Sequence, residues 1–269
     1  MGPLTTAYII SAYKLPEQLI RLVARLQGPS RSFYIHVDAT APAAVHERIV
    51  QGLTSHPNVH FLPRHACRWG DFGHVRATLK GLAAIDDSGL DPDYVALLTG
   101  QDYPIKSNEH IDQYLSRRAG ASFMNHRPLP VEGLEQGGYE RLPEGLVPGS
   151  LPIHFGSGYW CLHRDAVEYV AEFLRAHPAF VPFFEQVRVP DEMFFQTILL
   201  NSPLRGTIVN DDLRFIKWPG PKVLTSDDWH EIQAAPDLFA RKFDADTDAG
   251  IMDLIDRHLL ASPAGSPSR

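Results

Sequence analysis

Three features of the sequence predict an α/β fold in which helices cover both faces of a mostly parallel sheet. Short apolar runs alternate with amphipathic stretches through the first half of the chain. The runs are apolar throughout, which is typical of parallel strands buried on both faces. With 269 residues, of which 44% are apolar, the chain is long enough to bury a large core.

The elements follow one another in strand–helix order. Buried strands are expected at Ala7–Ala12, Ser32–Val37, Val59–Leu62 and Tyr94–Leu98, and helices at Glu17–Leu26, Ala43–Gly52 and Val75–Asp86. Pro128–Pro152 is rich in proline and glycine and is expected to form a long ordered loop or a small subdomain. Later elements are expected at Tyr159–Leu162 (strand), Asp165–Ala176 (helix), Pro190–Leu200 (helix), Arg214–Trp218 (strand) and Asp248–Leu260 (helix). We expect one catalytic domain over residues 1–261 and a disordered tail at 262–269.

Composition excludes several classes of function. The net charge of −7 and the lack of a basic tract argue against a nucleic-acid partner. No stretch approaches the roughly 18 apolar residues that a membrane span needs, so we expect a cytoplasmic protein. Cys67 and Cys161 are too few for a disulfide framework and are expected to be reduced thiols.

Ligands of parallel sheets bind beyond the carboxyl ends of the strands. The loops that reach this edge are Ser11–Lys14, Asp38–Ala41, Pro63–Gly73 and Thr99–Lys106. All four are rich in polar and aromatic residues, so they are the first place to search for a site.

The sequence contains no strong motif for binding a metal ion or a nucleotide phosphate. The spacing of Gly70–Gly73 fits neither type of glycine-rich phosphate loop. Asp-x-Asp pairs, which hold a divalent ion against a diphosphate, occur only before a strand or in a late acidic turn, at Asp91–Asp93, Asp244–Asp246 and Asp246–Asp248. At the strand end where such a motif would serve, only Asp102 is present. His36 and Asp38 are either two metal ligands or a hydrogen-bonded pair.

Charged residues late in the chain suggest an alternative to a metal. Glu192 lies in Val189–Glu192, where proline and acidic residues suit a helix start, and a fixed carboxylate there is either a simple helix-start residue or a general base. Asp191 is expected to point elsewhere and to act as a cap. Five cations, which are either surface charges or partners of a diphosphate, are Arg214, Lys217, Lys222, Arg241 and Lys242.

Trp69 and Trp218 lie in loops beside glycine or proline. Such aromatic faces either stack on a sugar or nucleobase or pack in the core.

Eight segments in order resemble the core-2/I-branching β-1,6-N-acetylglucosaminyltransferases, which form glycosyltransferase family 14 with the protein xylosyltransferases. The segments are Tyr8–Tyr13, Tyr34–Asp38, Trp69–Val75, Leu98–Lys106, Gly156–Trp160, Val189–Glu192, Phe215–Trp218 and Leu238–Asp244. The resemblance implies a GT-A fold and metal-independent, inverting transfer from a UDP-sugar, GlcNAc first, to a glycan acceptor. The alternatives are a xylosyl- or glucuronosyltransferase and a non-catalytic UDP-sugar-binding domain.

The resemblance also implies roles for individual residues. Glu192 is the expected base, and Lys242 the cation that neutralises the diphosphate. The nucleotide is expected to contact Ser11, Asp38, Trp69, Asp102 and Arg241, and the acceptor to contact Asn125, Arg141 and Trp218. Lys222 or Arg214 is expected to replace the family's second diphosphate cation.

The chain departs from the animal members of the family in two respects. We expect a bacterial-type member without their membrane anchor, and the chain has only two cysteines. Gly220 stands where an acceptor-contacting tyrosine is expected, and the region 125–152 differs, so we expect an acceptor other than a mucin core. A glycoside hydrolase is disfavoured because no second carboxylate is evident.

Overall fold

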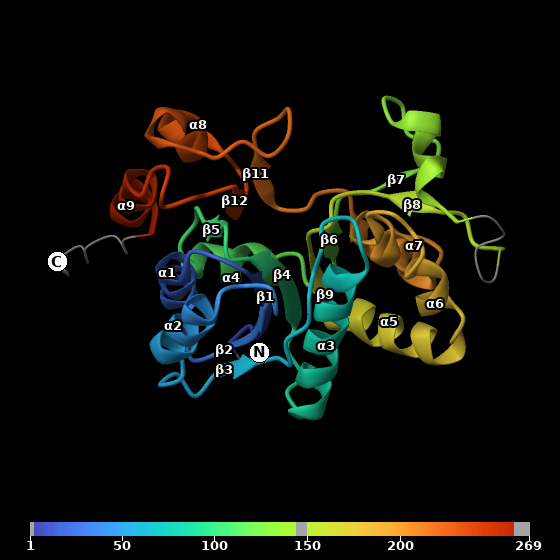
Figure 1. Ribbon diagram of the computed structural model, residues 1–269, viewed down its shortest axis with the longest axis horizontal. Helices are drawn as coiled ribbons and strands as arrows, with labels where there is room; N and C mark the ends of the chain where they lie inside the picture. The colour runs from blue at the N-terminus through green and yellow to red at the C-terminus, as the bar shows by residue number, and fades with distance from the viewer. Residues whose placement is uncertain (1–2, 144–149, 261–269) are drawn as a thin grey trace.

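The computed structural model describes residues 3–143 and 150–260 (Figure 1). Within these residues a seven-stranded sheet has the order β10-β6-β9-β4-β1-β2-β3. Its strands are β1 (Thr6–Ala12), β2 (Arg31–Val37), β3 (Val59–Phe61), β4 (Tyr94–Thr99), β6 (Ser122–Met124), β9 (Trp160–His163) and β10 (Ile208–Val209). Among these described strands β9 alone runs antiparallel to its neighbours, β4 and β6. The predicted mixed, mostly parallel sheet is confirmed.

Helices pack on both faces of this sheet. Along β1, Tyr8 and Ile10 face one core while Ala7 and Ile9 face the other, because successive side chains of a strand point to opposite faces. The first core is shared with α1 (Pro16–Leu26), α2 (Ala43–Leu53), α4 (Asn108–Ser116), α8 (Trp229–Ala234) and α9 (Gly250–Ile255). The second is shared with α3 (Gly73–Asp87), α5 (Arg164–Ala176), α6 (Phe180–Phe184) and α7 (Phe194–Leu200). The expected coverage of both faces is therefore confirmed.

Two smaller sheets lie near the edge of the main sheet where its parallel strands have their carboxyl ends. One has the order β11-β12-β5 and contains β5 (Asp102–Pro104), β11 (Arg214–Ile216) and β12 (Phe239–Arg241). The other pairs β7 (Arg127–Pro128) with β8 (His154–Phe155). The remaining short helices are η1 (Glu135–Arg141), η3 (Pro190–Glu192), η4 (Pro203–Thr207), η5 (Ser226–Asp228) and η6 (Asp256–Leu260). Of these additions, β7, β8, β11, β12 and η3 contribute residues to the cavity at the edge where β1 and β4 end.

Most predicted elements are found within one or two residues of their expected bounds. The predicted strand at Arg214–Trp218 is shorter, because it ends at Ile216 before the Trp218–Pro219 turn. The predicted closing helix divides into α9 and the π-helical turn η6. Cys67 and Cys161 are free thiols, as expected. The tail predicted at 262–269 lies outside the described residues.

The predicted helix at Pro190–Leu200 is not continuous. Pro190–Glu192 form one 3₁₀ turn, Met193 leaves helical geometry with φ −134°, and α7 starts only at Phe194. The Glu192 carbonyl accepts a hydrogen bond from the Gly156 amide at 2.8 Å. That contact takes the carbonyl out of the helical ladder, so the break is set by a partner distant in sequence.

Within the described part of the chain, no helix is both long and apolar enough to cross a membrane.

Candidate active site

A cavity of about 1000 Å³ opens where β1 and β4 end. Ser11 from β1 and Thr99 from β4 lie in its wall, which places it at the edge that the loop composition indicates. Of the residues expected from the sequence to form the site, those that line it are Ser11, Trp69, Asn125, Glu192, Trp218, Arg241 and Lys242. Asp38, Asp102, Arg141 and Lys222 lie outside the lining. The structure thus brings most of the expected residues to one cavity.

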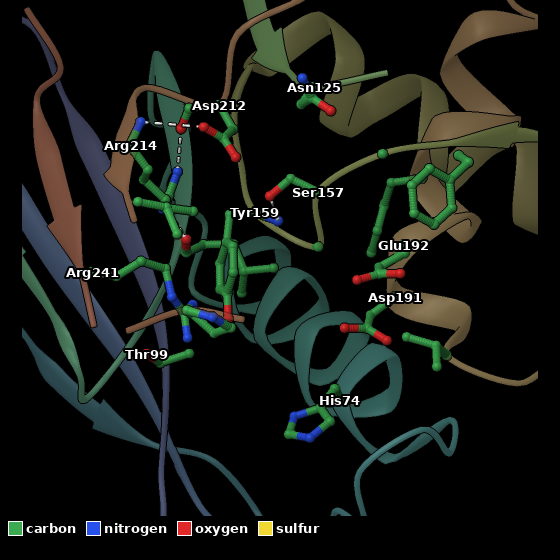
Figure 2. Close-up of a pocket in the computed structure, with 18 of the residues that line it drawn as sticks. His74, Thr99, Asn125, Ser157, Tyr159, Asp191, Glu192, Asp212, Arg214 and Arg241 are labelled. Carbon is green, nitrogen blue, oxygen red and sulfur yellow. Dashed lines mark hydrogen bonds between the residues drawn. The ribbon is translucent and has the colours of Figure 1, made fainter. Parts of the chain in front are cut away.

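Cations gather on one side of the cavity, together with Asp212, and two further acids lie on the other side. Figure 2 shows Arg214 and Arg241 on one side and Asp191 and Glu192 on the other. We call Arg214, Arg241 and Lys242 the cationic end, and Asp191 with Glu192 the acidic end. The two ends define where an anionic and a proton-donating group of a substrate would lie.

The cationic end is built on β11, β12 and the residue that follows β12. Asp102 is fully buried behind it, with Oδ1 3.8 Å from both Arg214 Nε and Arg241 Nη1. The other carboxylate oxygen accepts from the Thr99 amide and, at 2.7 Å, from the Thr99 hydroxyl. Asp102, expected to contact nucleotide, therefore holds the arginines in place from behind the wall.

The guanidinium groups of the cationic end are only partly used by the protein. Arg214 donates to the backbone carbonyls of Asp212 and Leu97. In the described residues, Arg241 Nε and Nη1 are buried and have no hydrogen-bond partner. The Arg241 guanidinium lies 4.0 Å from the centre of the Tyr159 ring, in cation–π contact. Among the described residues Asp102 is the one acid that pairs with either guanidinium, so the cationic end keeps positive charge for an anionic ligand.

Lys242 completes the cationic end. Partial burial lowers the pKa of its amine, and the nearby Lys14 and Arg241 charges lower it further. Lys222, by contrast, is exposed and lies outside the cavity lining. Of the two residues considered for the second diphosphate cation, Arg214 is the one that faces the cavity.

The acidic end results from the break at Met193. Asp191 and Glu192 both line the cavity, and both carboxylates lie on its same side (Figure 2). The expectation that Asp191 points elsewhere and acts as a cap is wrong, because Val189 is the cap residue and no side chain caps the turn. A second carboxylate is therefore present, but the two do not flank a common bond as those of a glycoside hydrolase do.

Glu192 pairs with Arg141 from η1, with Nη1 and Oε2 2.6 Å apart. Burial raises the pKa of Glu192, while the hydrogen bond and charge of Arg141 oppose that shift. The Arg141 guanidinium also lies 5.2 Å from the centre of the Phe155 ring. Arg141, expected as an acceptor contact, thus reaches the site through Glu192.

Asp38 organises the loop that carries Trp69. Its Oδ1 accepts from the Thr40 amide at 2.7 Å and its Oδ2 from the Cys67 amide at 3.2 Å. Burial acts to raise the pKa of Asp38, but these hydrogen bonds outweigh it and the pKa is lowered. An ionised Asp38 therefore ties the end of β2 to the loop.

Trp69 and Trp218 are exposed, at 79% and 68% of their surface, and both line the cavity. Core packing is therefore excluded for both side chains. Their faces are open to a ligand at the cavity mouth.

His36, His65 and Cys67 form a cluster with the atom types of a metal site. His65 Nδ1 lies 3.1 Å from both His36 Nε2 and Lys80 Nζ, while His65 Nε2 faces the Gly73 carbonyl at 2.8 Å and Cys67 Sγ at 3.6 Å. The possible ligand atoms approach different nitrogens of His65, and an ammonium group lies among them. This geometry is that of a hydrogen-bonded network rather than of ligands around one ion.

Sequence reasoning missed several residues of the wall. They are His74, Thr99, Ser157, Gly158, Tyr159 and Asp212. Ser157, Gly158 and Tyr159 lie within the matched segment Gly156–Trp160, which is the signal that points to them. The loops around His74 and Thr99 were likewise singled out, but no chemistry distinguished these two side chains.

Comparison with known proteins gives the family. The model described as "Branch: Core-2/I-Branching enzyme" matches residues 6–243. Xylosyltransferase 2 of Rattus norvegicus is 28% identical over 99% of this chain and 35% of its own length. Xylosyltransferase 1 of Homo sapiens is 27% identical over 99% of this chain and 32% of its own. The chain spans about a third of the length of these relatives.

A solved structure of the galactosyltransferase LgtC, in complex with donor and acceptor sugar analogs, aligns over 97% of this chain and 98% of its own, with 10% identity and a TM-score of 0.42.

The family match covers every described strand and all the residues that line the charged cavity. The chain belongs to the Core-2/I-branching enzyme family, which its xylosyltransferase relatives share.

Proposed function

We propose that this protein is an inverting, metal-independent glycosyltransferase that moves a sugar from a UDP-sugar to a hydroxyl group of a glycan. The observation that supports this most is the placement of buried cations and a carboxylate at opposite ends of one cavity. Transfer of this kind needs a charge to stabilise the leaving diphosphate and a base to deprotonate the attacking hydroxyl.

The cationic end is where we place the diphosphate. Arg241 and Lys242 line the cavity and each adds a positive charge. Arg214, held by Asp102, is the third. Together they supply the charge that a divalent ion supplies in enzymes with an Asp-x-Asp motif. Trp69 and Ser11 lie in the same cavity, and we assign them to the nucleotide.

Glu192 is the base in this proposal. It takes the proton from the acceptor hydroxyl while the oxygen forms a bond to the anomeric carbon and the bond from that carbon to UDP breaks. The electron pair of the broken bond leaves with UDP, next to the cationic end. One displacement of this kind inverts the anomeric centre. We assign three residues to the acceptor. Asn125 and Trp218 line the cavity, and Arg141 pairs with Glu192.

UDP-GlcNAc is the first donor to test, as the resemblance of the sequence suggests. UDP-xylose is the second, because the curated relatives are xylosyltransferases. UDP-glucuronic acid is the third. The cytoplasmic location expected from the sequence stays a prediction.

The test is UDP release from each of these donors, with and without a panel of saccharide acceptors, in excess EDTA. We expect acceptor-stimulated release from at least one donor and no loss of rate with EDTA. Binding of UDP-sugars without any release would contradict catalysis and indicate a binding domain. A strict requirement for manganese would contradict the metal-free mechanism.

A further inference from the structure

Asp191 lies next to Glu192 in the cavity wall, but the proposed mechanism leaves it without a task. Arg141 donates to Glu192, whereas within residues 3–143 and 150–260 the Asp191 carboxylate accepts only from its own backbone amide. The carboxylate nonetheless lines the cavity. A charged acceptor in that position is open to a ligand.

The two adjacent carboxylates face different elements. Glu192 pairs with Arg141 of η1, the short helix that comes after Asn125 in the chain. Asp191 lies toward His74 on α3, as Figure 2 shows. α3 starts directly after the loop that carries Trp69, and the Val189 amide donates to the Gly70 carbonyl of that loop at 2.9 Å. Asp191 is therefore held beside the loop that carries Trp69, which the proposed function assigns to the nucleotide.

Gly158 provides the space that the Asp191 carboxylate occupies. A Cβ atom at position 158 would lie 2.9 Å from Asp191 Oδ2, which is too close for a carbon–oxygen contact. A side chain at 158 would displace the carboxylate. The Gly158 backbone and the turn at Pro190–Glu192 thus fix the carboxylate from two sides.

We propose that Asp191 is a donor-specificity residue, whose carboxylate accepts hydrogen bonds from hydroxyl groups of the sugar of the UDP-sugar. This inference rests on the proposed function. The sugar joins the diphosphate, at the cationic end, to the attacking hydroxyl, at Glu192, so it lies between the two, beside Asp191. A carboxylate is a strong acceptor for such hydroxyls because the bond is assisted by charge.

The same carboxylate selects the class of sugar. The carboxylates of Asp191 and Glu192 lie on the same side of the cavity and burial raises the pKa of both, so added negative charge is unfavourable here. Glu192 contributes a second acid a residue away. The acidic end therefore favours a neutral sugar, such as xylose or GlcNAc, over a uronic acid, which carries its own carboxylate.

The experiment is isothermal titration of the whole chain with UDP, UDP-xylose, UDP-GlcNAc and UDP-glucuronic acid. The variants are Asp191→Asn, Gly158→Ala and, as a matched control, Asp87→Asn, whose side chain is exposed at the end of α3. We expect at least one neutral UDP-sugar to bind wild type about tenfold more tightly than UDP, the size of one charge-assisted hydrogen bond. Asp191→Asn is expected to remove most of that difference in affinity and to leave the affinity for UDP within about twofold of wild type. It is also expected to strengthen the binding of UDP-glucuronic acid relative to the neutral donors.

Gly158→Ala keeps the charge of Asp191 but displaces its carboxylate. It is therefore also expected to lower the affinity of the neutral UDP-sugars relative to UDP, and it provides a second test if Asp191→Asn folds poorly. The control variant binds all four ligands as wild type does. If the neutral donors keep their advantage in the variants, or never have one over UDP, Asp191 does not bind the sugar although the proposed function stands. If wild type binds neither UDP nor any UDP-sugar, the proposed function fails and this inference fails with it.

Discussion

The two ends of the cavity are built differently. The cationic end rests on β11 and β12, and its arginines are held by Asp102, which is fully buried. The acidic end rests on a single 3₁₀ turn, and its Glu192 is held by Arg141 from the short helix η1. Under the proposed function, strands hold the cations that meet the leaving diphosphate, and turns and loops hold the base that meets the acceptor. This difference predicts that changes at the cationic end affect UDP binding, whereas changes at Glu192 affect turnover.

Glu192→Gln is expected to have the largest effect. The amide keeps the size of the side chain but cannot take a proton, so kcat is expected to fall by about 10² to 10⁴. UDP affinity, which belongs to the cationic end, is expected to stay within about twofold of wild type. Steady-state transfer assays and calorimetry check both values, with Glu172→Gln on the outer part of α5 as control. Full activity in Glu192→Gln would assign the base elsewhere.

Asp102→Asn is expected to affect stability as well as binding. Removing one partner of a buried ion pair leaves uncompensated charge, at a cost of about 3 kcal/mol of unfolding free energy. UDP affinity falls too, because Arg214 and Arg241 lose their anchor. Urea unfolding measures the loss of stability. Asp253→Asn, which breaks an ion pair with Arg21 in which Asp253 is 60% exposed, is expected to cost about 1 kcal/mol or less. Equal losses in the two variants would contradict the role given to Asp102.

Lys242→Ala tests the cationic end without disturbing its anchor. One charge-assisted contact to the diphosphate is worth about 1.5 to 3 kcal/mol, or roughly 10- to 150-fold in Kd for UDP. The KM for acceptor is expected to stay near its wild-type value. Lys217→Ala is the control, because Lys217 pairs with Asp228 and Glu231 away from the cavity. An unchanged UDP affinity in Lys242→Ala would remove Lys242 from the donor site.

Arg141→Ala is expected to shift a pH profile rather than abolish activity. Burial raises the pKa of Glu192 and Arg141 opposes that rise, so loss of Arg141 raises the pKa further. The base works only when ionised, and the acid limb of kcat/KM therefore moves to higher pH, by about one unit. Arg76→Ala, which breaks an exposed pair with Glu185, leaves the limb in place. A limb that moves to lower pH would contradict the pairing.

Local patterns predicted the scaffold well and the acidic end less well. The strand at Ala7–Ala12 was predicted correctly because burial on both faces leaves an apolar run in the sequence itself. Pro190 correctly marked a helical start, but the break at Met193 depends on the Gly156 amide, which is 36 residues from Glu192 in the chain. No local pattern reports such a contact. The orientation of Asp191 could therefore not be predicted, and it became visible only in the structure.

The cationic end shows the same limit in another form. The sequence placed Arg214 and Lys222 on equal terms, because both are cations near the Trp218 turn. Their difference comes from the parallel pairing of β11 with β12, which sets Arg214 beside Phe239 and next to Asp102. Strand pairing of this kind joins residues far apart in sequence and leaves no local signal.

The most direct test of the central claim is the anomeric configuration of the first product, followed by NMR during transfer from an α-linked UDP-sugar in excess EDTA. A single displacement with Glu192 as base and the cationic end holding UDP predicts a β-linked product at a rate that EDTA does not change. An α-linked product, or transfer only after a divalent metal is added, would contradict it.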